Sequence, residues 1–396
     1  MKILNYFLLL FLFVFASRSI AEVRINGFAS LYAGKTLNSE ETLYDYSNEI
    51  DWQNESLFAI QVSADVMEGL SATAQLMARG NNDFNAEFEW AYITYEVTDS
   101  SQLSVGKLRI PFYRYSDFLD VGYAYRWARP PKSVYNLNFS TYEGLSYLNN
   151  HSLGDWDSTV QFIYGAVDTK FTVFSDSDRG KLKDTFGLNW TVSNGWLTGR
   201  AAYFITETTI DSSASPELSG LVAGLNAYGL SEQADSVLIN GDDSYFVAAG
   251  IGIDYNDFLL DAEYTQFEIE NSVLAKQSQF YVSLGYRMDA ITFSVTYEDN
   301  DDENPSDQYN TVPRFITAPN GTQIPVVVPG PAGPLFLQDL TNLTFASQTD
   351  KSNSYSMTVR YDFHPSAAFK FEYTMYDDDL TNQDADLISF GIDLVF

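Results

Sequence analysis

The chain has 396 residues, of which 45% are apolar and 19% charged, and its formal net charge is −31. This composition is that of a folded globular or membrane protein and excludes a disordered tail. The excess of 53 acidic over 22 basic residues predicts no nucleic-acid partner, and the absence of cysteine excludes disulfides, thiolate metal sites and cysteine nucleophiles.

The first 21 residues have the pattern of a secretory signal peptide. Lys2 is followed by an apolar run from Tyr6 to Ala16 and then by the small-residue motif Ser19-Ile20-Ala21. The alternative is an uncleaved anchor, but the apolar run is shorter than the roughly 20 residues that a helix needs to cross a membrane. We therefore predict that residues 1–21 are cleaved and that residues 22–396 form a single domain.

The rest of the chain consists largely of segments in which apolar and polar residues alternate. In one of them Ile291, Phe293 and Val295 alternate with Thr292 and Ser294. This period of two is that of a β-strand. The sequence predicts sixteen strands, over approximately residues 23–33, 52–66, 70–79, 88–98, 102–109, 141–148, 156–165, 184–192, 196–207, 244–255, 258–269, 277–287, 291–298, 352–363, 367–376 and 387–396.

The connections between these strands alternate between long and short. Long connections such as 110–140 and 299–351 alternate with turns such as 67–69 and 99–101. The polar faces are rich in Ser, Thr, Gly and Asn, and many apolar faces end in an aromatic residue. These features predict an all-β protein, a 16-stranded antiparallel transmembrane β-barrel with short periplasmic turns and long extracellular loops, embedded in outer-membrane lipid.

The last strand carries a further signal of this class. Ile388, Phe390, Ile392, Leu394 and the terminal Phe396 share one face. This arrangement resembles the C-terminal strand that outer-membrane barrels present to the barrel assembly machinery. We therefore predict that machinery as a partner and a Gram-negative outer membrane as the location.

The connection 299–351 holds seven of the twelve prolines, which disfavour strand pairing. We interpret it as a long external loop that is solvated and variable, with folding over the barrel mouth or binding of a neighbour as alternatives. Two acidic runs, 298–303 and 377–379, are dense enough to attract divalent cations but lack the spacing of a helix-loop-helix calcium site. The sequence predicts no metal site and no cofactor.

Catalytic residues are not expected. The two histidines, His151 and His364, fall in connections assigned to the periplasmic side, away from the outer rim where an outer-membrane enzyme would place its site. A hydrolase also needs a base within hydrogen-bond reach of its nucleophile, and no such pair stands out. The chain is therefore predicted not to be an enzyme.

The third long connection differs from the others in its charge. Between Gly106 and Lys132 it concentrates more than a quarter of all basic residues of the chain, with only two acidic ones. The basic residues are Lys107, Arg109, Arg114, Arg126, Arg129 and Lys132, and the acidic ones are Asp117 and Asp120. The segment is also rich in aromatic residues and proline, which indicates that it packs against another part of the protein.

The segment from 88 to 135 resembles Gram-negative porins, most closely the porin-like proteins of marine gammaproteobacteria. The resemblance rests on Trp90-Ala91-Tyr92, on the run from Gly106 to Tyr113, on the run from Asp120 to Tyr125 and on Arg129-Pro130-Pro131. It implies that the third loop folds into the barrel, that residues near 107–132 form the pore constriction, and that the protein is a homotrimer associated with lipopolysaccharide. Pro111-Phe112 departs from the acidic, glycine-rich motif of enteric porins, so the ion preference stays open.

Strand parity places four more arginines on polar faces, where they are candidates for the pore wall: Arg79, Arg200, Arg287 and Arg360. Because an inward-folded loop narrows a wide barrel, the predicted function is passive diffusion of small hydrophilic solutes and ions. The local charge at the narrowing, rather than the total charge, sets its field. The alternative is a closed-pore barrel whose long loops act in adhesion or surface binding.

Overall fold

The computed structural model describes residues 22–396, apart from 138, 171–177, 304, 306–307 and 381–382. The predicted signal peptide, residues 1–21, lies outside the described residues. No helix in the described part of the chain is both long and apolar enough to cross a membrane.

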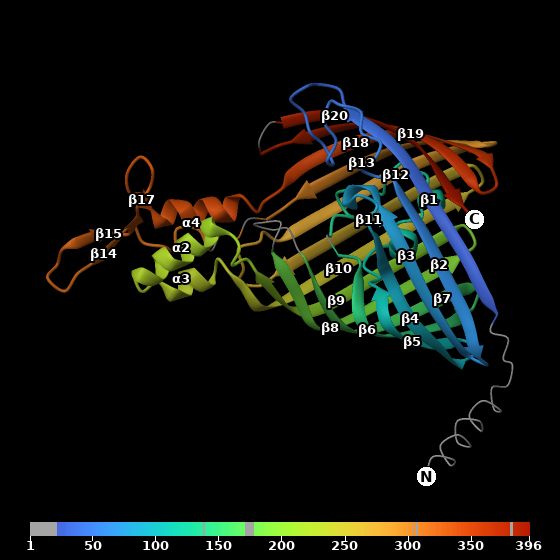
Figure 1. The fold of residues 1–396 in the computed structure, drawn as a ribbon, viewed down its shortest axis with the longest axis horizontal. Helices are drawn as coiled ribbons and strands as arrows, with labels where there is room; N and C mark the ends of the chain where they lie inside the picture. Colours follow the sequence, from blue (N-terminus) through green and yellow to red (C-terminus); the bar gives the residue numbers. More distant parts are fainter. Residues whose placement is uncertain (1–21, 138, 171–177, 304, 306–307, 381–382) are drawn as a thin grey trace, which may run out of the picture.

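Sixteen antiparallel strands form a closed barrel, in which the first strand pairs with the last (Figure 1). The strands are β1 Val23–Thr36, β2 Leu57–Met67, β3 Leu70–Arg79, β4 Ala86–Thr98, β5 Ser101–Arg109, β6 Thr141–Leu153, β7 Trp156–Lys170, β8 Arg179–Asn194, β9 Leu197–Asp211, β10 Ile239–Tyr255, β11 Phe258–Ile269, β12 Gln277–Met288, β13 Ile291–Asp301, β18 Lys351–His364, β19 Ala367–Asp378 and β20 Gln383–Val395. The predicted fold class is confirmed. We call the two ends of the barrel the short-turn end and the long-loop end.

The barrel wall has apolar side chains on its outer face and polar side chains on its inner face, the reverse of a water-soluble protein. On β13, Phe293 and Val295 are 43% and 50% exposed on the outside, whereas Ser294 and Thr296 are buried on the inside. Apolar side chains on the outer surface are stabilised only where hydrocarbon replaces water. The closed ladder also leaves no unpaired strand edge in the lipid.

The histidines occupy strands rather than connections, so their predicted placement in turns is wrong. The β6–β7 ladder extends to the pair Leu153–Trp156, because Gly154, with φ of 65°, closes a two-residue turn. His151 therefore lies within β6, and His364 is the last residue of β18. Both remain near the short-turn end.

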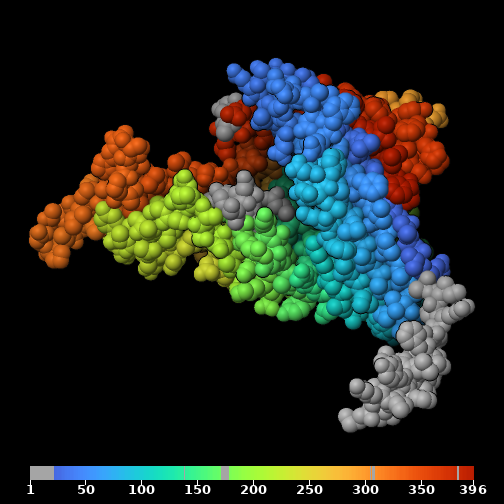
Figure 2. Space-filling model, in the orientation of Figure 1, coloured from blue at the N-terminus to red at the C-terminus, as the bar shows by residue number. Residues whose placement is uncertain are grey.

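Two long connections fold together into a module outside the barrel. It contains the helices α2 Pro216–Ala227, α3 Ser231–Asp235 and α4 Leu337–Ala346 and the short strands β14 Phe315–Thr317, β15 Gln323–Pro325, β16 Val327–Val328 and β17 Leu335–Phe336. Three short 3-10 turns complete the elements: η1 Gly80–Asn82, η2 Ser116–Phe118 and η3 Gly122–Ala124. We call residues 210–239 and 309–346 the outer-loop module, and Figure 2 shows it projecting from the barrel rim.

The outer-loop module has its own apolar core, so the interpretation of 299–351 as a solvated loop is wrong for these residues. Leu221 and Leu225 of α2 are buried with Val326, Leu337 and Phe345. Ser215 caps α2 by accepting a hydrogen bond from the Leu218 backbone N–H, and Pro216 follows at the first helical position. The prolines are tolerated because most of the segment is irregular or forms two-stranded ribbons.

The module core predicts a specific weak point in α4. Phe345 is 0% exposed and Leu343, two residues earlier, is 65% exposed. Phe345→Ala is expected to lower the module's free energy of unfolding by about 3–5 kcal/mol, whereas Leu343→Ala is expected to change it by less than about 0.5 kcal/mol. Trypsin cleavage after Arg314 measures the difference, with the barrel remaining resistant; equal cleavage rates would contradict the packed module.

Candidate pore site

The connection between β5 and β6 lies inside the barrel, and we call residues 110–140, apart from 138, the inner loop. One side of it packs against inward-facing side chains of β9 and β10. The ring centroid of Phe112 lies 4.8 Å from that of Phe204 and 4.7 Å from that of Phe246. Arg200 on β9 donates hydrogen bonds to the carbonyl oxygens of Pro111 and Phe112. The loop therefore enters the lumen at this wall.

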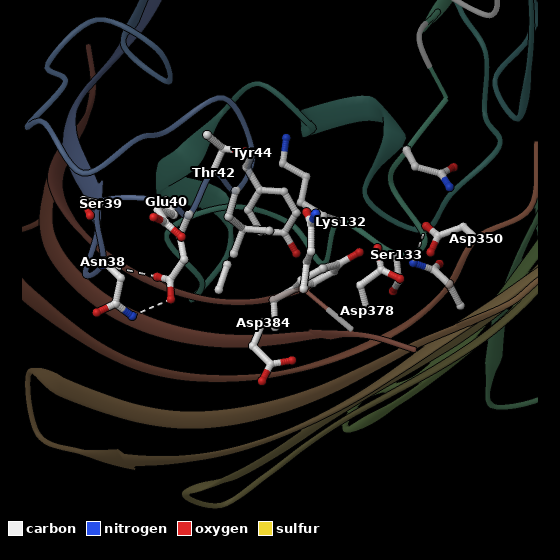
Figure 3. A pocket seen from close by; sticks show the side chains of 17 residues that line it. Asn38, Ser39, Glu40, Thr42, Tyr44, Lys132, Ser133, Asp350, Asp378 and Asp384 are labelled. Carbon is white, nitrogen blue, oxygen red and sulfur yellow. Dashed lines mark hydrogen bonds between the residues drawn. The ribbon is translucent and has the colours of Figure 1, made fainter. Parts of the chain in front are cut away.

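An acidic cavity of about 800 Å³ lies between the inner loop and the long-loop end (Figure 3). Its lining carries five carboxylates, those of Glu40, Glu41, Asp350, Asp378 and Asp384. Among the described residues that line it, Lys132 of the inner loop is the only cation. The Lys132 ammonium lies 5.8 Å from the centroid of the Tyr44 ring. We call this space the outer cavity.

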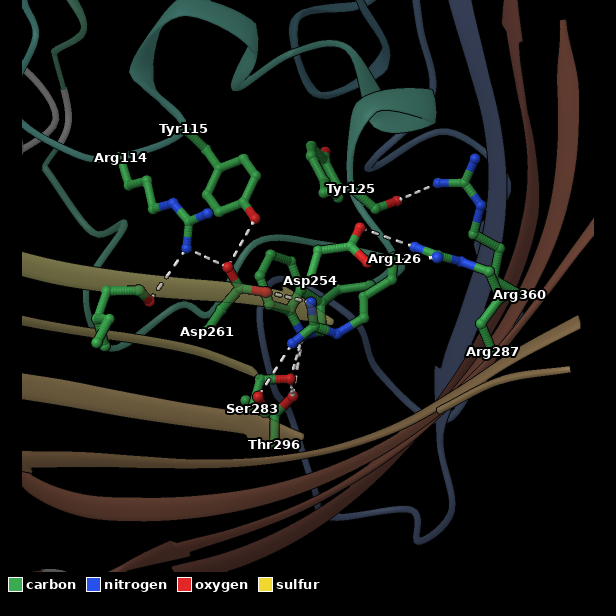
Figure 4. Close-up of polar contacts among 12 residues, drawn as sticks. Arg114, Tyr115, Tyr125, Arg126, Asp254, Asp261, Ser283, Arg287, Thr296 and Arg360 are labelled. Carbon is green, nitrogen blue, oxygen red and sulfur yellow. Dashed lines mark hydrogen bonds and ion pairs between the residues drawn. The ribbon is translucent and has the colours of Figure 1, made fainter. Parts of the chain in front are cut away.

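Asp261 on β11 is a shared partner of two inner-loop arginines. Its carboxylate pairs with Arg114 and Arg126 and accepts a hydrogen bond from the Tyr115 hydroxyl at 3.1 Å (Figure 4). Trp127 Nε1 donates at 2.9 Å to hydroxyl oxygens on the next two strands, those of Ser283 and Thr296. The inner loop is thereby bound to β11, β12 and β13.

Arg129 binds the inner loop to a second part of the wall. Its side chain is 6% exposed and pairs at 2.8 Å with Glu372 on β19 and at 2.8 Å with Glu55 in the connection between β1 and β2. The Ala128 backbone N–H donates to the Glu372 carboxylate at 3.0 Å. Burial would raise the pKa of Glu55, but the Arg129 guanidinium outweighs burial and holds this pKa below its ordinary value.

Asp120 connects the inner loop to β3, β4 and β5. Its carboxylate pairs with Arg109, at the end of β5, and lies 3.1 Å from Arg79 on β3. Arg79 also pairs with Glu89 on β4 at 2.8 Å. Burial would raise the pKa of Asp120, but Arg109 and Arg79 hold it below its ordinary value. Two cations and two carboxylates thus alternate at this wall.

The tip of the inner loop contacts the strands that close the barrel. Lys370 on β19 pairs with Asp393 on β20 at 2.8 Å and donates to the Gly122 carbonyl oxygen at 2.6 Å. The Asp393 carboxylate also accepts hydrogen bonds from Ser30 and Tyr32 on β1. A Cβ on Gly122 would overlap Asp393 Oδ1, so a residue without a side chain permits this approach.

All four arginines predicted on the wall face the lumen. Arg79 and Arg200 contact the inner loop as described above. Arg360 on β18 donates to the carbonyl oxygens of Tyr123 at 2.8 Å and Tyr125 at 2.7 Å. Arg287 pairs with Asp254 at 3.0 Å and, with Arg360, lines a cavity of about 340 Å³ near the short-turn end.

Three of the eight predicted constriction residues stand apart from these ion pairs. Lys107 shares the strand face of Val105, which is 47% exposed on the outside, and its ammonium donates to the Phe88 carbonyl oxygen at 2.9 Å. Asp117 is exposed on the inner loop. Neither Asp117 nor Lys132 has an ion pair within 4.0 Å in the described part of the chain.

Three cavities follow one another through the barrel. The outer cavity shares Tyr44 and Lys132 with a middle cavity of about 280 Å³, which is lined by Glu55, Asp120 and Arg129 among others. The middle cavity and the cavity near the short-turn end have Tyr125 in common. Tyr125, 8% exposed, therefore separates the spaces on the two sides of the inner loop.

The sequence did not identify the wall residues that bind the loop. Asp261 and Glu263 on β11, and Lys370 and Glu372 on β19, are inward-facing charged pairs two residues apart. The sequence signal for such residues is a charged side chain on the polar face of a strand, acidic or lysine as well as arginine.

Comparison with known proteins places this geometry in a family. A family model described as Gram-negative porin matches residues 8–393. No curated protein sequence matches the chain. Among solved structures, OmpF of Salmonella typhi, solved with daunomycin, is 14% identical, with a TM-score of 0.56 and coverage of 95% of this chain and 98% of that chain.

Two further solved structures share the fold. An anion-selective porin from Comamonas acidovorans is 10% identical, with a TM-score of 0.56 and coverage of 95% and 100% of the two chains. OmpT of Vibrio cholerae, in a trimer form, is 12% identical, with a TM-score of 0.53 and coverage of 95% and 99%. The protein therefore belongs to the Gram-negative porin family and is a channel protein of the outer membrane.

Proposed function

We propose that the inner loop forms the constriction of this channel and that small hydrophilic solutes and ions pass it by diffusion. The proposal is supported by the three cavities: the outer and middle cavities share Lys132 of the inner loop, and the middle cavity and the cavity near the short-turn end share Tyr125. Arg109, Arg114, Asp120, Arg126 and Arg129 are the residues that set its charge. Because the long loops of this family face the outside, the outer cavity is the extracellular entrance.

The proposed constriction is compensated in charge. The basic excess of the inner loop faces carboxylates of the wall, Glu89, Asp261 and Glu372, and that of Glu55 in the connection between β1 and β2. Paired charges present little net field to a passing ion, whereas the outer cavity carries an excess of carboxylates. We therefore expect a weak preference for cations, set at the entrance rather than at the narrowest point.

Planar lipid bilayers containing the purified, folded protein test this function. Discrete conductance steps and a reversal potential slightly towards the cation equilibrium potential, under a gradient of potassium chloride, are the expected result. The preference should weaken as salt is raised, because screening shortens the reach of the entrance carboxylates. Folded protein without conductance steps would contradict the channel and favour the closed-pore alternative.

The proposed assembly is a homotrimer in contact with outer-membrane lipid and lipopolysaccharide. The trimer form of OmpT of Vibrio cholerae supports it at the level of the fold. Phe396, which is 62% exposed and exchanges backbone hydrogen bonds with Gly27, is the residue proposed to engage the barrel assembly machinery. Native mass measurement that finds only monomers would contradict the trimer.

A further inference from the structure

One cavity inside the barrel differs in chemistry from the three of the proposed route. It has a volume of about 230 Å³ and lies between the inner loop and the wall formed by β8, β9, β10 and β11. Its lining includes Phe112 and Phe139 of the inner loop, Leu182 on β8 and Phe204 on β9. We call it the apolar side pocket.

The inner wall at this pocket differs from the hydroxyl-rich inner wall at β13 and β18. Inward positions on β13 and β18 are occupied by buried hydroxyl residues such as Ser294 and Ser356. At the side pocket the inward positions of β8, β9 and β10 include Leu182, Phe204 and Phe246. A water-filled channel alone does not require apolar side chains on its inner face.

None of the described residues that line the side pocket is charged, whereas each of the three cavities on the route carries both acidic and basic side chains. Moving an ion from water into such surroundings is costly, but moving a neutral apolar group there is favourable. The side pocket therefore discriminates against the small ions that the channel itself is proposed to conduct.

The aromatic rings of the side pocket are held in a fixed arrangement. The Phe112 ring lies 5.6 Å from Phe139 and 4.8 Å from Phe204, between centroids, and meets both edge to face. Asn136, Gln277 and Gln348 add amide groups to the lining. Preformed aromatic walls with a few polar groups are the features of a small-molecule site.

The position of the side pocket determines from which side it fills. Its lining on β9 and β11 comes from the ends of these strands that lead into the long loops, with Thr208 and Ile269 as examples. The pocket thus lies on the extracellular side of the inner loop. A solute reaches it without passing Tyr125.

We propose that the apolar side pocket binds small neutral aromatic solutes that enter from the extracellular side. A cavity of about 150 Å³ lined by Leu, Ile and Phe holds benzene, so the larger side pocket has room for one aromatic ring with a polar substituent. A hydroxyl substituent would form hydrogen bonds with the amide groups of the lining. This binding does not depend on ion conduction, so the proposed channel function and this site can fail separately.

The test uses the full chain in lipid nanodiscs and 4-fluorophenol as the probe, observed by fluorine NMR. Thr206→Phe fills the pocket, because Thr206 lines it on the inward face of β9. Leu274→Asp places a charge in the lining and is a second variant should the first fail to fold. Ile205→Phe is the matched control, since Ile205 is the neighbouring residue and is 44% exposed on the lipid face.

We expect saturable binding above that of empty nanodiscs in the wild type and in Ile205→Phe, and affinity at least about tenfold weaker in Thr206→Phe and Leu274→Asp. The anionic probe 4-fluorobenzoate should bind at least about tenfold more weakly than 4-fluorophenol to the wild type. Absence of a saturable signal overturns the proposal. So does equal binding by the wild type and both pocket variants, because the probe then binds outside the apolar side pocket.

Discussion

Replacing Lys370 with Met is expected to lower the barrel's free energy of unfolding by about 3–5 kcal/mol, the cost of removing one partner from a buried ion pair. Lys370 and Asp393 are both 0% exposed, and their charged atoms lie 2.8 Å apart. In Lys370→Met the Asp393 carboxylate keeps, among the described residues, the hydroxyl donors of Ser30 and Tyr32. The Gly122 carbonyl oxygen also loses its hydrogen bond from Lys370.

Urea unfolding in lipid vesicles, followed by tryptophan fluorescence, measures the loss. Lys351→Met is the matched control, because Lys351 pairs with Asp301 at 2.7 Å but the two side chains are 43% and 68% exposed. Solvent screens such a pair, so a much smaller loss is expected. The double variant Lys370→Met with Asp393→Leu should recover part of the stability, because no buried charge is left unpaired. Equal losses in Lys370→Met and Lys351→Met would contradict the importance of burial.

The barrel could be predicted from the sequence because strand alternation is a local property. A period of two is visible within one segment, and the closed, lipid-facing barrel follows from the requirement that every backbone group be paired in the membrane. Parity also placed Arg79, Arg200, Arg287 and Arg360 towards the lumen. Lys107 is two residues from Val105, so strand alternation puts both on the same, outer face. Lys107 is among the predicted constriction residues because of the resemblance to porins.

The partners of the inner loop could not be predicted, because they come from distant parts of the chain. Arg129 and Glu372 are separated by 243 residues, and the pairing depends on the path of the inner loop through the lumen. The sequence of the outer-loop module does contain one helical pattern. Leu337, Thr341 and Phe345 recur at the helical spacing of four and are the buried residues of α4, whereas the prolines before them favour irregular structure.

Replacing Arg109 and Arg126 together with Gln is expected to move the reversal potential towards the cation equilibrium potential. Arg109 pairs with Asp120, and Arg126 pairs with Asp261, so the double substitution leaves carboxylates partly uncompensated at the proposed constriction. Charges at a narrowing with low-dielectric walls act on passing ions at short range and with little screening. Because about 1.4 kcal/mol corresponds to a tenfold change in an equilibrium constant, partial exposure of these carboxylates should raise the cation-to-anion permeability ratio several-fold.

Two further variants test whether the inner loop sets the ion preference: one removes a carboxylate at the proposed constriction, and the other removes a cation far from it. Asp261→Asn leaves Arg114 and Arg126 without their shared carboxylate and is expected to shift the reversal potential towards the anion equilibrium potential. Arg314→Gln removes a cation from the outer-loop module, where Arg314 pairs with Asp339, and should produce no shift. Bilayer measurements under one salt gradient compare the three variants directly. If the Arg109 and Arg126 double variant and Asp261→Asn leave the reversal potential unchanged while conductance persists, these residues lie off the ion path, and the permeating ions pass elsewhere in the barrel.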